Sequence, residues 1–296
     1  MERIAFIGFG EVGQTVSKGL LAGQRVEIRA FDLLFDAGKL KDRAAELGVG
    51  VARDHADAVR GADMVFLAVT AGSSMEAARS CLPGLSAGQL FLDINSVSPR
   101  RKQETAALVA PTGARYVDVA VMTPIAPYAH KAPILCGGPG AREWLARAQS
   151  LGMNVEIVSE EVGPAAAIKM FRSIMVKGFE GLMLECMLAA SEYGVEDRIV
   201  AALKESYPGV DWQYFSGYWI ERVLTHGKRR AEEMREVAAT VRACGLEPLM
   251  SAATAERHDW LARLGVKLSE KTQDRDQLVA AIRAALGKGP RRQKAA

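Results

Sequence analysis

Three closely spaced glycines near the start of the chain constrain its fold more than any other feature. Gly8, Gly10 and Gly13 form a G-x-G-x-x-G motif, which follows an apolar run at 4–7 and precedes a helical pattern at 12–21. In a turn from strand to helix, the first glycine allows the tight bend, the second lets the backbone approach a pyrophosphate, and the third lets helix and strand pack closely. The motif alone is a weak signal, but its place between a strand and a helix predicts a dinucleotide-binding turn.

This turn and the ends of later strands contain the residues that we expect to bind the dinucleotide. They are Gly8, Phe9, Gly10, Glu11, Val12, Gly13, Asp32, Val69 and Thr70. Asp32 follows an apolar run about 20 residues beyond the glycines, where an acidic side chain accepts hydrogen bonds from the ribose hydroxyls of NAD. A carboxylate there repels a 2′-phosphate, so we predict NAD rather than NADP. Two alternatives stay open: Asp32 is only a turn or helix-cap residue, or Lys39, Lys41 or Arg43 binds an NADP phosphate.

Short apolar runs alternate with helical patterns over the first half of the chain. The runs are 4–7, 26–31, 64–69, 90–94, 116–119, 134–136 and 155–158. Such alternation is typical of repeated β-α-β units that build a mainly parallel sheet with helices on both faces. We therefore predict an α/β fold, with a doubly wound Rossmann domain at 1–162.

The rhythm changes after Gly163, where the chain becomes helical throughout. Residues 164–193 carry one helix signature, with Pro164 in the first turn and Gly194 after the end. A helix of that length would be on the order of 45 Å long, too long for one small domain to bury. We expect it to connect the domains and to pack against a second subunit. Further helical patterns cover 195–205, 213–224, 230–244, 249–264 and 274–286.

These patterns predict an all-α substrate and dimerisation domain at 163–286, followed by a disordered tail at 287–296. The tail is rich in Gly, Pro and basic residues and lacks periodicity, and a basic contact arm is its alternative reading. On the long helix, Lys177 and Glu180 are spaced to pair with each other. The aromatic residues between 212 and 219 are expected in core or dimer packing rather than in a substrate wall.

Composition excludes several classes of protein. Lys and Arg number 38 against 35 Asp and Glu, a net charge of +3, which gives no field strong enough to attract nucleic acid. The chain lacks a run of about 18 apolar residues and begins without a leader pattern, so we expect a cytoplasmic protein with no membrane partner. Its four cysteines lack metal-binding or redox spacing, and we expect reduced thiols in the core and no metal.

Polar residues at strand ends are the first candidates for contact with a substrate. Asn95 and Ser96 follow the apolar run at 90–94, and open α/β sheets bind ligands at the carboxyl ends of their strands. These two residues are equally compatible with a plain loop. Thr123 lies in a Pro-rich loop at 123–133, which reads equally as a lid and as a surface loop.

Lys169 is the strongest single candidate for a catalytic residue. It lies among apolar residues in the first turns of the predicted long helix, where a charge is costly unless it has a partner or serves a site. Such surroundings should lower its pKa toward the range of a general acid or base. Arg172 and Ser173, one turn on, share its face and offer a carboxylate clamp and a hydroxyl. The alternative is that Lys169 and Arg172 are only charged residues on a solvent-exposed face of the helix.

Taken together, these segments resemble the superfamily of 6-phosphogluconate and β-hydroxyacid dehydrogenases along the whole chain. The glycines and Asp32 match its nucleotide fingerprint, and 93–99 (DINSVSP) resembles its DxSTxxP segment. Residues 117–121 look like the start of its DAPVSGG segment, and 163–173 (GPAAAIKMFRS) like its GxGxxxKxxxN segment. The resemblance implies that Lys169 is the catalytic lysine and that the helical half forms a dimer interface.

Three departures from the family pattern restrict the range of substrates that we expect. Met122, Thr123 and Pro124 stand where the family has Ser, Gly and Gly, Ser173 replaces an Asn, and Val176 replaces the Glu of the phosphogluconate branch. Phosphogluconate is therefore not expected. The run KMFRSIMVKGFEGL resembles a branch whose C-terminal domain has no assigned function.

These observations predict hydride transfer between a nicotinamide and the carbinol carbon of a small hydroxy acid or related alcohol. Lys169 would take the hydroxyl proton, and the groups that would orient the substrate are Arg172, Ser173, Asn95, Ser96 and Thr123. Two alternatives remain. One is an imine or ketone reductase of the same plan, and the other is a dinucleotide sensor without turnover.

Overall fold

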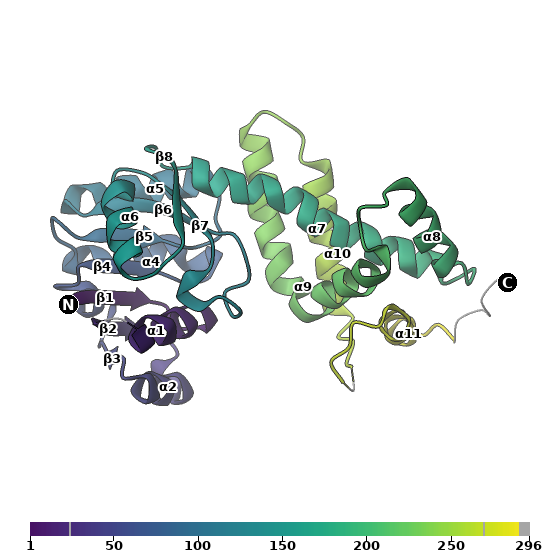
Figure 1. Ribbon diagram of the computed structural model, residues 1–296, viewed down its shortest axis with the longest axis horizontal. Helices are drawn as coiled ribbons and strands as arrows, with labels where there is room; N and C mark the ends of the chain where they lie inside the picture. Colours follow the sequence, from purple (N-terminus) through teal and green to yellow (C-terminus); the bar gives the residue numbers. More distant parts are fainter. Residues whose placement is uncertain (24, 269, 290–296) are drawn as a thin grey trace. The chain divides into compact units, whose positions relative to one another are not determined.

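The computed structural model describes residues 1–23, 25–268 and 270–289. It divides into two compact units, Met1–Met170 and Phe171–Ala296, and the division falls within one long helix, α7 (Figure 1). Most of the predicted tail at 287–296 lies outside the described residues. The predicted domain boundaries stay predictions.

The first unit contains an eight-stranded sheet with the order β3-β2-β1-β4-β5-β6-β7-β8. The strands are β1 Glu2–Ile7, β2 Val26–Phe31, β3 Gly50–Val51, β4 Met64–Leu67, β5 Leu90–Asp93, β6 Arg115–Val121, β7 Ile134–Gly137 and β8 Val155–Ser159. Every neighbouring pair is parallel except β6 and β7, which run antiparallel. The predicted α/β fold with a doubly wound sheet is confirmed; β3, with two residues, is too short to form an apolar run.

Helices cover both faces of this sheet (Figure 1). They are α1 Glu11–Gly23, α2 Lys39–Leu47, α3 His55–Val59, α4 Ser74–Cys81, α5 Pro99–Val109 and α6 Ala141–Ser150. Successive residues of a strand point to opposite faces, so Ile4 and Phe6 belong to one apolar core and Ala5 and Ile7 to the other. The second core includes Val109 of α5, the helix that follows the carboxyl end of β5.

The helical half contains α7 Pro164–Ala190, α8 Glu196–Ser206, α9 Trp212–Ala243, α10 Leu249–Arg263 and α11 Arg275–Ala285. The two patterns predicted at 213–224 and 230–244 were wrong as separate helices, because α9 continues through both. At Gly227, between them, an added Cβ would lie 2.9 Å from the His258 carbonyl oxygen of α10. The glycine therefore allows close helix packing, and this packing compensates for its low helix propensity.

The cysteines are all free thiols, as predicted. Cys81 and Cys136 are buried, and burial raises the pKa of each thiol to about 12. The prediction of a core position was wrong for Cys244, which is exposed where α9 ends. Among the described residues, no helix is long and apolar enough to span a membrane, and no group of side chains suits a metal ion.

Candidate active site

The glycines of the turn between β1 and α1 have three different surroundings. At Gly8, which has a φ of +94°, an added Cβ would lie 2.3 Å from the Ala68 carbonyl oxygen. At Gly13 it would lie 2.6 Å from the Gly8 carbonyl oxygen, whereas at Gly10 it would meet nothing within 4 Å. The chain's own packing thus requires two of the glycines. The open space over Gly10, beside the N-terminus of α1, fits a pyrophosphate.

Asp32 lies directly after β2 and contacts this turn. Its Oδ2 atom accepts a hydrogen bond from the Phe9 amide at 2.7 Å, and its Oδ1 atom accepts one from the Leu34 amide at 2.8 Å. The carboxylate therefore shapes a turn and also places a negative charge next to the glycines. Of the basic residues considered for an NADP phosphate, Arg43 pairs with Glu46 at 2.6 Å.

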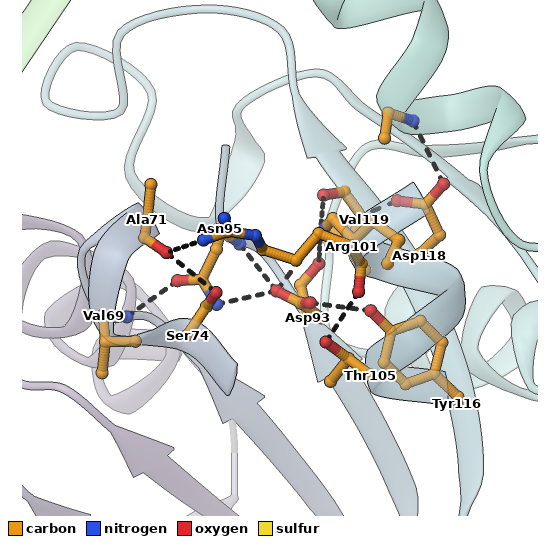
Figure 2. Close-up of polar contacts among 12 residues, drawn as sticks. Val69, Ala71, Ser74, Asp93, Asn95, Arg101, Thr105, Tyr116, Asp118 and Val119 are labelled. Atoms are coloured by element: carbon orange, nitrogen blue, oxygen red, sulfur yellow. Dashed lines mark hydrogen bonds and ion pairs between the residues drawn. The ribbon is translucent and has the colours of Figure 1, made fainter. Parts of the chain in front are cut away.

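Asn95 connects the ends of two neighbouring strands (Figure 2). Its Oδ1 atom accepts a hydrogen bond from the Val69 amide at 2.9 Å, and its Nδ2 atom donates one to Asp93 Oδ1 at 2.7 Å. With 5% of its surface exposed, Asn95 stabilises the carboxyl edge of the sheet between β4 and β5. Ser96 is partly buried beside it, and Thr70 Oγ1 lies 3.1 Å from Ser73 Oγ.

Sequence reasoning missed Lys102, the charged side chain at the centre of this edge. The residue lies on α5 and is fully buried. Its Nζ atom lies 3.2 Å from Asp93 Oδ1 and 3.7 Å from Asp118 Oδ1, and it donates to the backbone carbonyls of Asp93 and Val119. A signal was present: Lys102 shares one helical face with Thr105 and Val109, the buried residues of α5.

Asp118, on β6, holds the start of α7. Its Oδ2 atom accepts hydrogen bonds from the Gly163 amide at 3.0 Å and the Ala166 amide at 3.1 Å, two donors that the helix itself leaves unpaired. Tyr116 donates its hydroxyl to Asp93 Oδ2 at 2.7 Å (Figure 2). Burial, together with the charge of Asp93, raises the pKa of Tyr116 well above its usual value.

The residues predicted to surround a substrate fall in both units. Lys169 lies in the second turn of α7, partly buried, and belongs to the first unit together with Asn95, Ser96 and Thr123. The Thr123 hydroxyl oxygen is buried and has no hydrogen-bond partner in the part of the chain that the structure describes. Arg172 and Ser173 belong to the second unit; Arg172 is exposed, and Ser173 is buried and accepts a hydrogen bond from Lys177 at 3.1 Å.

The predicted pairing of Lys177 with Glu180 was wrong, because α9 provides both partners. Lys177 lies 3.0 Å from Glu233, and Glu180 lies 2.6 Å from Arg230. Burial lowers the pKa of Lys177 and raises that of Glu180, in each case against the opposing effect of the partner. A helical repeat shows which residues share a face but not which charges a neighbouring helix brings to it.

The remaining predicted features have packing roles. The aromatic side chains of α9 pack against one another, with ring centres 4.7 Å apart for Phe215 and Trp219, and all except the exposed Tyr214 belong to the core of the helical half. The loop at 123–133 rests on α1, where an added Cβ at Gly19 would lie 2.3 Å from His130 Nδ1. Burial lowers the pKa of His130.

Comparison with known proteins identifies the family of the chain. Residues 3–151 match the NAD binding domain of 6-phosphogluconate dehydrogenase, and 190–261 match a domain of unknown function. The chain therefore belongs to the superfamily of 6-phosphogluconate and β-hydroxyacid dehydrogenases. Within it, the second match assigns the chain to the branch with a C-terminal domain of unassigned function.

Three relatives illustrate the range of similarity. A conserved hypothetical protein from Sinorhizobium meliloti has 37% identity and a TM-score of 0.77, with 96% of this chain and 97% of that chain covered. A conserved protein of unknown function, described as similar to 3-hydroxyacid dehydrogenases, has 30% identity and a TM-score of 0.70, covering 88% and 98%. An NAD-dependent L-serine dehydrogenase from Pseudomonas aeruginosa is 27% identical over 72% of each chain.

Proposed function

We propose that this protein is a cytoplasmic NAD-dependent dehydrogenase that acts on the CH–OH group of a small hydroxy acid or related alcohol. The observation that carries the proposal is the contact of Asp118 with the first turn of α7. Through it, the helical turn before Lys169 is held at the carboxyl ends of the parallel strands, within the unit that contains the glycine turn. Ligands of open α/β sheets bind at this edge.

Different residues of the chain would bind the cofactor and transfer the proton. The α1 N-terminus and Gly10 would hold the pyrophosphate, and Asp32 the ribose hydroxyls, with its charge favouring NAD over NADP. NAD, when bound, supplies the hydride acceptor. Lys169 would accept the proton of the substrate hydroxyl through its ε-amino group, which must be neutral to do so.

Orientation of the substrate is assigned to five polar residues. They are Arg172, Ser173, Asn95, Ser96 and Thr123. Thr123 is favoured because its hydroxyl has no hydrogen-bond partner among the described residues, and a ligand oxygen could engage it. Asn95, whose side chain already bonds Val69 and Asp93, would act mainly by keeping the strand ends in register.

A screen of substrates on the wild type and on Lys169→Ala tests the proposal. L-Serine, other 3-hydroxy acids, sugar acids and aryl alcohols are supplied with NAD or NADP, and reduced nicotinamide is followed by absorbance. We expect turnover that prefers NAD and falls by about 10²-fold or more in Lys169→Ala, because the proton acceptor is lost. Lys228→Ala, at an exposed lysine of α9, is the matched control and should keep wild-type activity.

The two alternatives give different results in the same screen. Turnover that is equal in Lys169→Ala contradicts the proton-transfer role and favours the imine or ketone reductase, which is then tested with cyclic imines. Tight NAD binding without turnover of any substrate favours a dinucleotide sensor.

We also propose that the protein is a homodimer that pairs through α7. Five large apolar side chains of this helix are between 37% and 58% exposed: Ile168, Phe171, Met175, Phe179 and Leu182. They recur at three- and four-residue spacing and so form one stripe along the helix. Exposed apolar patches of this kind mark association surfaces.

A further inference from the structure

We propose that Lys102 is a positioning residue for the reaction: its buried ammonium is the shared counter-ion of Asp93 and Asp118, and through Asp118 it fixes the turn of α7 that precedes Lys169. This inference rests on the function proposed above. It assigns to α5, a helix without any predicted site residue, a part in the placement of the catalytic lysine.

Lys102 lies between two buried carboxylates. Asp93 and Asp118 are both 0% exposed, and burial of two carboxylates is costly unless a positive charge and hydrogen bonds compensate them. Lys102 Nζ lies 3.2 Å from one and 3.7 Å from the other. The remaining negative charge faces the positive end of the α7 dipole and two of its amide groups, which stabilise it.

Hydrogen bonds of Asp93 and Asp118 connect the Lys102 ammonium to further residues on two sides. On one side, Asp93 accepts hydrogen bonds from Asn95, which in turn accepts one from the Val69 amide after β4 (Figure 2). On the other side, Asp118 holds the amides of Gly163 and Ala166. One side chain therefore joins the strand ends to α7, and all of these residues lie within Met1–Met170.

Loss of the Lys102 charge would affect the start of α7. The two buried carboxylates would then lack their shared counter-ion, and the hydrogen bonds that hold the first turn of α7 would weaken. Lys169 lies three residues after Ala166, so its amine would sample a wider range of positions. Proton transfer needs heavy atoms about 3 Å apart, and a misplacement of about 1 Å can lower a rate by about 10²-fold.

The test compares three variants with the wild type. Lys102→Met removes the charge at similar size. The double variant Lys102→Met/Asp118→Asn removes one charge of each sign, so the net charge of the cluster is unchanged and the new amide oxygen can still accept from Gly163 and Ala166. Thr105→Val is the matched control, because Thr105 is equally buried on the same helix and bonds only the Arg101 carbonyl among the contacts described.

Two readouts are needed: kcat and KM on the best substrate, and hydrogen exchange of the amides at 163–167. For Lys102→Met we expect kcat at least tenfold lower, KM within about threefold, and exchange at least tenfold faster. The double variant should recover kcat to within about fivefold of the wild type. Thr105→Val should lower the melting temperature without changing kcat or the exchange at 163–167.

The outcomes separate this inference from the proposed function. Hydrogen exchange requires no substrate, so faster exchange at 163–167 in Lys102→Met supports the link to α7 even if no hydroxy acid is turned over. If Lys102→Met does not fold while the double variant folds and turns over, the counter-ion role is supported. Unchanged exchange and kcat in Lys102→Met, or a folded double variant with kcat reduced more than tenfold, overturns it.

Discussion

The three glycines of the β1–α1 turn differ in whether the packing of the chain requires them. Gly8 and Gly13 are required by contacts of the chain with itself, whereas an added Cβ at Gly10 would meet nothing within 4 Å. Packing of the chain therefore does not account for a glycine at position 10, whereas the pyrophosphate site proposed above would. This difference makes the three positions a test of cofactor binding that needs no substrate.

We expect Gly10→Ala to change the free energy of unfolding by less than about 1 kcal/mol and to weaken NAD binding at least tenfold, because its methyl group would occupy the space of the pyrophosphate. Chemical denaturation and fluorescence titration with NAD measure the two effects. Gly8→Ala is the counterpart and should unfold or strongly destabilise the protein, since its Cβ would overlap the Ala68 carbonyl. Unchanged NAD affinity in Gly10→Ala would argue against this turn as the cofactor site.

At the scale of the helices, a buried titratable side chain makes the stability of the C-terminal helices depend on pH. His258 of α10 is 0% exposed, and its Nε2 atom lies 3.8 Å from Glu180 Oε2 of α7. Burial, with smaller effects from Arg230 and Lys177, lowers the pKa of His258 from 6.5 to about 4. The imidazole is therefore neutral in the folded protein at neutral pH.

The sign of the pH dependence follows from this shift. Between pH 6.5 and about 4 the unfolded chain binds a proton at His258 that the folded chain does not, so stability falls as the pH falls through this window. His258→Leu removes the titration. We expect the loss of unfolding free energy from pH 7 to pH 4.5 to be smaller in the variant by roughly 2 kcal/mol. Urea denaturation at both pH values measures it, and equal losses in variant and wild type would refute the assignment.

At the scale of the whole molecule, the apolar stripe of α7 predicts the oligomeric state. Met175→Glu and Leu182→Glu each place a charge at a side chain that is more than half exposed in the single chain. Burial of this charge in an interface would be costly, so we expect a wild-type dimer and monomeric variants. Sedimentation velocity measures the masses. Leu249→Glu, at a 70% exposed residue of α10, is the control and should remain dimeric; a monomeric wild type at micromolar concentration would contradict the proposal.

Sequence periodicity was sufficient for the architecture but not for the site. The alternation of apolar runs with helical patterns predicted seven of the strands and the change to an all-α second half. Asp32 and Lys169 could be predicted as site residues because each stands at a fixed spacing within a motif. Lys102 belongs to no motif, and the Pro-Arg-Arg-Lys start of α5 reads as an exposed helix until the structure shows which face is buried.

What the sequence by itself determined is the glycine turn, the parallel sheet, the long helix and the family, because each depends on the order and spacing of residues close together in the chain. What only the tertiary structure decided is which charges meet: Lys102 with Asp93 and Asp118, and Lys177 with Glu233. A long side chain can reach partners on any element packed beside it. Its partner therefore depends on the packing of elements that are far apart in the chain, and the spacing of neighbouring residues does not specify this packing.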